Sequence, residues 1–128
     1  MNRLREGLKY KYWNCYLDVG LYPQSFNKNI GLTLIDIEDD SPIAKITVNP
    51  ERSFPQTHMC IKDYSENDGM LEFVEKNRIA IIDDTATCIL MESGQVAPCL
   101  RIATDIYEEY LKILDRYKKE SPLQRTQK

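Results

Sequence analysis

The only histidine of the chain and one of its cysteines are the residues whose spacing could support nucleophilic chemistry. His58 and Cys60 are two residues apart, so in a strand they would lie on the same face. A cysteine nucleophile with a histidine base also needs a group that orients the imidazole, and no Asn or Asp stands beside this pair. A lone histidine in a loop is usually a surface residue. We therefore expect a connection between elements here, and no catalytic residues.

The four cysteines offer a second kind of chemistry, metal binding. They are Cys15, Cys60, Cys88 and Cys99. None forms a C-x-x-C pair, which structural zinc sites favour, and free cysteines are often small buried hydrophobes with inert thiols. We expect no metal site and no disulfide, and we expect all four thiols in the core.

Two pairs of adjacent acids, Asp39–Asp40 and Asp83–Asp84, could bind Mg²⁺ or act in acid–base catalysis. Both pairs fall in predicted turns, where such side chains bond their own backbone or face water. The sequence contains no glycine-rich phosphate loop, no G-x-S-x-G and no H-E-x-x-H. We therefore expect no cofactor and a protein that is not an enzyme, and an enzyme of unknown type is the third alternative.

An aromatic cluster near the start of the chain, "YKYWNCY", is the strongest candidate for binding. Its members are Lys9, Tyr10, Lys11, Tyr12, Trp13 and Tyr16. Aromatic residues dominate protein-interface hot spots, and rings interleaved with cations can also stack nucleobases. The alternative is a structural role, with the rings capping a sheet and packing on the C-terminal helix. All three interpretations stay open.

Charge is unevenly distributed along the chain. Residues 1–13 carry a net charge of +3 and residues 112–128 of +4, whereas the whole chain carries −3, so the middle is acidic. A helix C-terminus prefers cations, which explains part of this pattern. Basic ends could also dock a charged partner such as nucleic acid.

Size and composition indicate one ordinary folded domain. The chain has 128 residues, of which 42% are hydrophobic and 29% charged, and this length suits a single core. No apolar run is long enough to span a bilayer, and the opening residues are not a secretory signal. We expect residues 1–120 to form the domain, residues 121–128 a flexible tail, and the cytoplasm to be the location.

Alternating apolar residues predict an antiparallel meander and further strands. The expected strands cover residues 15–22, 30–37, 43–49, 59–63, 78–84, 86–93 and 94–102. In the third of these we expect Thr47 to face outward. The last is predicted at a sheet edge, because Pro98 cannot donate a ladder hydrogen bond. Isoleucines that change face near residue 35 indicate a bulge or twist.

Helical periodicity predicts helices near 67–77 and 104–119. We expect the first to be capped by Ser65, Asn67 or Asp68 and the second to bury Tyr110, Leu111 and Leu114 against the sheet. The expected fold class is α+β: an antiparallel sheet of five or six strands, beginning as a meander, with one short helix and one C-terminal helix packed on it.

Several segments resemble a bacterial family of domains of unknown function, number 4313. The resemblance covers about residues 15–102 and rests on "AKITVN" (Ala44–Asn49), "CIKD" (Cys60–Asp63), "LEFVEKN" (Leu71–Asn77) and "GQVAPCLRI" (Gly94–Ile102). Two features depart from the family pattern, the turn "DDTATC" and the helix that begins at Thr104. The resemblance implies cargo of a conjugative or phage-like mobile element in bacteria, and no functional residue.

The sequence therefore favours a non-enzymatic protein-interaction module. Its partner would be an unidentified protein, and the resemblance adds the idea of a mobile-element or phage-borne accessory or inhibitor of the anti-defence type. A nucleic-acid-binding protein that uses the basic termini and the aromatic cluster is the alternative. No membrane partner is expected.

Overall fold

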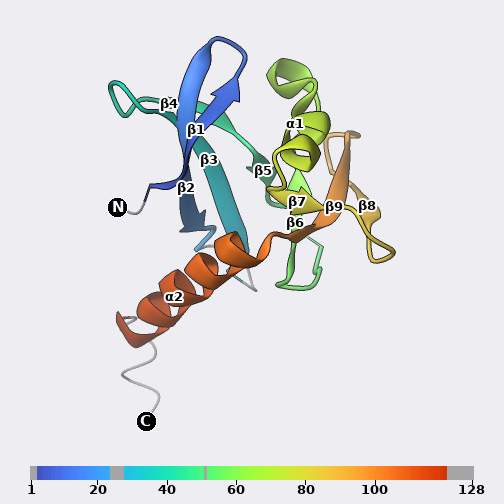
Figure 1. The fold of residues 1–128 in the computed structure, drawn as a ribbon. Coiled ribbons are helices and arrows are strands. Elements are labelled where there is room, and N and C mark those ends of the chain that lie inside the picture. The colour runs from blue at the N-terminus through green and yellow to red at the C-terminus, as the bar shows by residue number, and fades with distance from the viewer. Residues whose placement is uncertain (1–2, 24–27, 51, 121–128) are drawn as a thin grey trace.

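The computed structural model describes residues 3–23, 28–50 and 52–120, and the predicted tail 121–128 lies outside them. The described residues form nine strands and two α-helices, whose arrangement is drawn in Figure 1. The strands are β1 (Leu4–Tyr10), β2 (Trp13–Leu21), β3 (Ile30–Asp36), β4 (Pro42–Lys45), β5 (Thr47–Val48), β6 (His58–Ile61), β7 (Ala80–Ile81), β8 (Thr87–Leu90) and β9 (Val96–Ile102). The α-helices are α1 (Met70–Lys76) and α2 (Thr104–Glu120), and η1 (Ser65–Asn67) is a short 3₁₀ helix.

The expected α+β class with antiparallel pairing is confirmed, and the strands are divided between two sheets. The first sheet has the order β1-β2-β3-β4. In the second, β5, β6, β9 and β7 follow one another and β8 also pairs with β9. Cys99 of β9 is opposite both Cys60 of β6 and Thr87 of β8, so β6 and β8 lie on opposite sides of β9. β7 pairs with β9 on the same side as β8.

The division between the sheets falls inside the segment predicted as one strand, residues 43–49. It is interrupted at Ile46, which is fully buried between β4 and β5. Thr47, which was expected to face outward, is also buried. That expectation is wrong because the Thr47 hydroxyl has distant partners: it accepts a hydrogen bond from the backbone of Leu32 and bonds the hydroxyl of Tyr22.

Strand β1 was not predicted, and its backbone explains why. Arg5 and Gly7 both have positive φ, at 55° and 92°, and the pairing of β1 with β2 shifts register between Leu4 and Leu8. This bulge breaks the alternation that identifies a strand. The face change near residue 35 is confirmed as a register shift, which lies in the ladder of β3 with β4.

Strand β9 lies inside its sheet, so the expected edge position was wrong. Its central location tolerates Pro98 because β6 pairs only with Arg101, Leu100 and Cys99. On the other side Pro98 is opposite Cys88. This is a non-hydrogen-bonded pair, because such pairs alternate with hydrogen-bonded ones along the ladder and Met91 with Gln95 is hydrogen-bonded. No ladder bond of β9 therefore requires an N–H at this position.

Helix α1 begins after Gly69, which adopts the left-handed conformation. None of the predicted capping side chains bonds its first turn; instead Asp63 accepts a hydrogen bond from the backbone of Leu71 at 2.8 Å. The helix ends at Lys76, one residue before the expected end, and Asn77 is its C-cap. Arg78, the next residue, has a positive φ of 53°.

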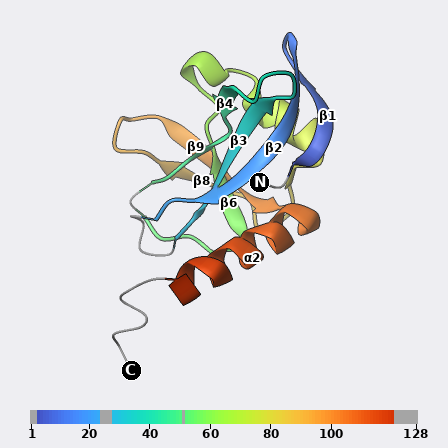
Figure 2. The ribbon, with the colours of Figure 1, turned by 90° about the vertical axis from the view of Figure 1, so that its left-hand side faces the viewer.

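Helix α2 packs on β2, and Figure 2 shows it running along one side of the sheets. Its buried residues include Ile106, Tyr110 and Leu114, whereas Leu111 is 40% exposed. The expectation for Leu111 is wrong because the helix contacts the sheets along a single stripe with i, i+4 spacing. The Tyr110 hydroxyl donates to the carbonyl of Lys28 at 2.9 Å, and burial raises the pKa of Tyr110 to about 12.

The main core joins both sheets and both helices. Its fully buried large side chains include Leu17, Leu32, Leu34, Ile46, Met59, Ile61, Met70, Ile79 and Ile106. A smaller cluster lies on the other face of the second sheet and contains Phe54, Cys60, Ile89, Ala97 and Cys99. In the described part of the chain, no helix is long and apolar enough to cross a membrane.

Candidate functional site

The turn between β1 and β2 carries the exposed part of the aromatic cluster. Tyr10 pairs with Trp13, so Lys11 and Tyr12 form a two-residue turn. Tyr12 is 90% exposed and Trp13 36% exposed, and their rings meet edge to face at 6.0 Å. Lys9 is exposed beside them. We call Lys9, Lys11, Tyr12 and Trp13 the hairpin tip.

The other two aromatic residues of the cluster are part of the packing. Tyr10 is buried, and its ring meets Phe73 of α1 edge to face at 5.1 Å. Tyr16 is fully buried, and its hydroxyl donates to Asp40 at 2.9 Å. Arg3 lies 4.6 Å from the centre of the Tyr16 ring. The structure therefore separates the six predicted binding residues into a surface group of four and a structural group of two.

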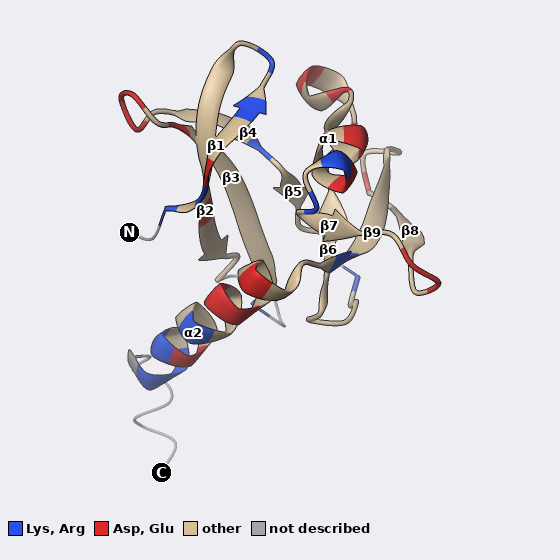
Figure 3. Ribbon diagram, in the orientation of Figure 1, with Lys and Arg blue, Asp and Glu red and all other residues tan. Residues whose placement is uncertain are grey.

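The described parts of the two basic ends, residues 3–13 and 112–120, do not meet. The hairpin tip and the last turn of α2 lie at opposite ends of the molecule in both views, and Figure 3 marks lysine or arginine positions along the ribbon at each. Arg3 is paired with Asp40, and Lys119 with Asp115. The described basic residues of the two ends therefore lie apart, and at each end one of them is paired with an acidic side chain.

His58 was expected at the surface, but it is buried at the start of β6. Its Nδ1 lies 2.8 Å from the Thr57 hydroxyl and its Nε2 lies 2.8 Å from the Thr85 hydroxyl. Thr85 donates its own proton to Asp83, so Nε2 must be the donor to Thr85. In the neutral ring Nδ1 is then the acceptor from Thr57. This arrangement fixes the imidazole on both sides.

The network continues to Arg101, whose Nε donates to Asp83 at 2.7 Å. Hydrogen bonds from Thr85 and Arg101 hold the pKa of Asp83 well below its usual range, while burial lowers the pKa of His58. The residues come from β6, β9 and the turn between β7 and β8. This chain of bonds therefore ties that turn to the second sheet around a neutral histidine.

Cys60 does not pair with His58, because it faces Cys99 across the ladder of β6 and β9. A hydrogen bond with the Cys99 thiol, together with burial, raises the pKa of Cys60. Burial likewise raises the pKa of Cys15. These thiols are in the core, as expected. Cys88 is exposed, so the prediction for it was wrong: it lies on the uncovered face of β8.

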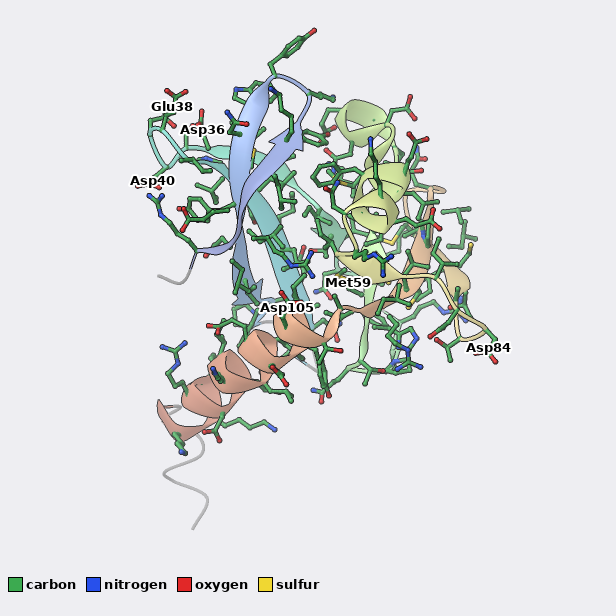
Figure 4. The ribbon with its side chains drawn as sticks, viewed as in Figure 1. Asp36, Glu38, Asp40, Met59, Asp84 and Asp105 are labelled. Carbon is green, nitrogen blue, oxygen red and sulfur yellow. The ribbon has the colours of Figure 1, made fainter. Side chains whose placement is uncertain are left out.

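The predicted acidic turns lie on different sides of the molecule. Asp36, Glu38 and Asp40 gather in the turn between β3 and β4, far from Asp84 (Figure 4). Asp36 accepts from the backbone of Glu38, and Asp39 accepts from Ser41, so these carboxylates close their own turn. Among the described residues, no three His, Cys, Asp or Glu side chains gather in a way that could hold a metal ion.

No protein-family model, curated protein or solved structure matches the chain. The resemblance to the family of domains of unknown function therefore stays a prediction.

Proposed function

We propose that this protein is a protein-interaction module that contacts its partner through the hairpin tip. The observation that supports this most strongly is the exposure of Tyr12 and Trp13 in a fold that buries Tyr10, Tyr16 and Tyr110. Exposed aromatic rings that rest on a fixed strand pair offer large contact area at small cost in conformational entropy. Such residues are enriched at the centres of protein interfaces.

The chemistry of the tip specifies the kind of partner. Lys9 and Lys11 flank the two rings, and the Lys11 ammonium also bonds the carbonyl of Glu66 at 3.3 Å. A protein surface with an apolar pocket bordered by carboxylates would complement this arrangement. Nucleic acid is a weaker candidate, because tracking a phosphate backbone needs a continuous basic groove, and the described parts of the two basic ends lie apart.

Two further parts of the proposal do not depend on the hairpin tip. Buried free thiols suit a reducing cytoplasm. An accessory or inhibitor role in a bacterial mobile element or phage rests only on the family resemblance.

The test compares the parent with a Tyr12→Ala, Trp13→Ala double variant. The matched control is Tyr117→Ala, which removes an exposed ring from α2, distant from the tip. Each tagged protein is used to capture partners from an extract of its host cells, and the captured protein is then purified and titrated. We expect the double variant to bind it at least about tenfold more weakly, the loss of one good contact.

The control variant should bind like the parent, and all three proteins should unfold at the same urea concentration. Equal binding by the double variant would refute the assignment of the tip. If the captured molecule is instead an oligonucleotide, with affinity that falls steeply as salt is raised, the nucleic-acid alternative replaces the proposal.

A further inference from the structure

Strand β8 forms an open edge of the second sheet. It pairs with β9 along Thr87–Leu90, and within the described residues no other strand pairs with it. Figure 1 shows β8 at the outer side of the molecule, beyond β9. The open edge is distant from the hairpin tip.

The direction of its backbone groups follows from the turn that joins β8 to β9. The Met91 N–H donates to the carbonyl of Gln95 at 2.7 Å, so these two residues form a hydrogen-bonded pair. Such pairs alternate along an antiparallel ladder, so Leu90 with Val96 and Cys88 with Pro98 are non-hydrogen-bonded pairs. The N–H and C=O groups of Cys88 and Leu90 therefore point away from β9, along the open edge.

The outer strands of the first sheet are protected, and the outer strands β5 and β7 of the second sheet are only two residues long. β8 is longer and unprotected. Proteins block exposed edges with bulges, prolines or charges. Strand β1 has a bulge at Arg5 and Gly7, and β4 begins with Pro42 and shifts register. In contrast, Thr87–Leu90 contains no charged residue and no proline, and no residue in it has positive φ. An unprotected edge of this kind is suited to accept another strand.

Side chains and charges around the edge specify what it accepts. On its uncovered face, Leu90 is 60% and Val96 52% exposed. Asp84 precedes β8 and Glu92 follows it, and residues 79–100 contain no lysine or arginine. If β8 of a second copy paired with this edge, parallel or antiparallel, its flanking acidic residues would lie beside those of the first copy. An apolar strand with basic ends would match the edge in charge.

We propose that the open edge of β8 binds an extended peptide by strand addition, with apolar residues beside Leu90 and basic residues at both ends of the bound segment. Its backbone would bond the outward groups of Cys88 and Leu90, as in other β-augmentation complexes. This surface is separate from the hairpin tip and does not depend on the function proposed for it.

The sharpest test changes one backbone donor. Cys88→Pro removes the outward N–H but no bond to β9, because residue 88 stands in a non-hydrogen-bonded pair. Cys88→Ser retains that N–H and is the matched control. The probe is a short fluorescein-labelled peptide in which valine and threonine alternate between terminal arginines. We expect it to bind the parent and Cys88→Ser equally, and Cys88→Pro at least about tenfold more weakly.

Two peptide controls make the test independent of the folding of Cys88→Pro. N-methylation of alternate peptide amides removes the reciprocal bonds, which the peptide N–H groups donate to the outward carbonyls of Cys88 and Leu90. Terminal glutamates in place of arginines reverse the charge match. Both should weaken binding to the parent by at least about tenfold. The Tyr12→Ala, Trp13→Ala variant should bind the probe unchanged.

Any of three results would overturn the proposal. These are equal binding of the normal and N-methylated peptides, no binding of the probe at a concentration of about 1 mM, and a dimer of the parent that Cys88→Pro dissociates. The last result would assign the edge to a second copy of the chain.

Discussion

Arg5 and Asp105, a hundred residues apart in the chain, form a two-bond ion pair. Arg5 Nε and Nη2 lie 2.8 and 2.9 Å from the two carboxylate oxygens of Asp105. The same guanidinium donates to the carbonyls of Asn77 and Arg78 at 2.8 and 3.0 Å. One side chain of β1 thus holds both the end of α1 and the start of α2.

This contact predicts a graded loss of stability. Arg5→Ala removes the ion pair and leaves two carbonyls without this donor, so we expect the free energy of unfolding to fall by about 1–3 kcal/mol. Asp105→Asn loses only a partly exposed charge pair and should cost about 0.2–1 kcal/mol. Arg5→Lys should resemble Arg5→Ala, because an ammonium cannot bond the four acceptors in this geometry. Urea unfolding measures all three, and an equal loss in Asp105→Asn and Arg5→Ala would contradict the role of the two carbonyls.

The buried stripe of α2 predicts a contrast between two leucines. Leu114→Ala should lower the free energy of unfolding by about 2–5 kcal/mol, as other core truncations do. Leu111→Ala should cost under about 1 kcal/mol, because the side chain is already in contact with water. Thermal and urea unfolding of both variants would test this contrast. Equal losses of unfolding free energy would mean that α2 is rotated about its axis relative to the described packing.

His58 predicts a pH dependence of stability. Burial holds its folded-state pKa below the ordinary value of 6.5, so as pH falls the unfolded chain binds the proton first. The free energy of unfolding should therefore be greatest above pH 6.5 and fall toward the folded pKa, by up to about 1.4 kcal/mol per pH unit.

His58 is the only histidine of the chain, so no other side chain ordinarily titrates there. Of its charged neighbours, Arg101 lowers the pKa of His58 further, and the Asp83 carboxylate raises it. Urea unfolding between about pH 5 and 7 should show this slope in the parent and a flat profile in His58→Gln. An unchanged slope in the variant would refute the assignment.

The thiols predict a difference in reactivity. In the native protein, Cys88 should react with a disulfide reagent such as Ellman's reagent, whereas Cys15, Cys60 and Cys99 should react only after unfolding, because they are buried. Cys88→Ser should abolish the native reaction and leave the folded structure intact. Rapid native reaction of more than one thiol would show that the strands β6 and β9 open readily.

Local patterns predicted those elements whose side chains alternate between core and solvent. Leu17, Val19, Leu32 and Leu34 are such residues, and their strands were found at nearly the right bounds. Patterns failed where a distant partner determines burial. Thr47 is buried because Leu32 and Tyr22 supply its bonds.

The same limit applied to the candidate site. Composition alone identified the aromatic cluster, but the division between Tyr12 and Tyr10 depends on the position of α1, which no neighbouring residue reveals. His58 was misplaced for a similar reason: Thr85, which bonds it, is 27 residues away. The open edge of β8 was missed because Pro98 indicated an edge on the wrong strand.

The late position of α2 in the chain has a consequence during synthesis. β2 leaves the ribosome well before α2, the helix that packs on it. The contacts of Ile106, Tyr110 and Leu114 can form only after α2 itself has been made. Until then Leu17 and Leu32 remain uncovered on the nascent chain, so a message truncated before residue 104 would yield a product suited to chaperone capture rather than to independent folding.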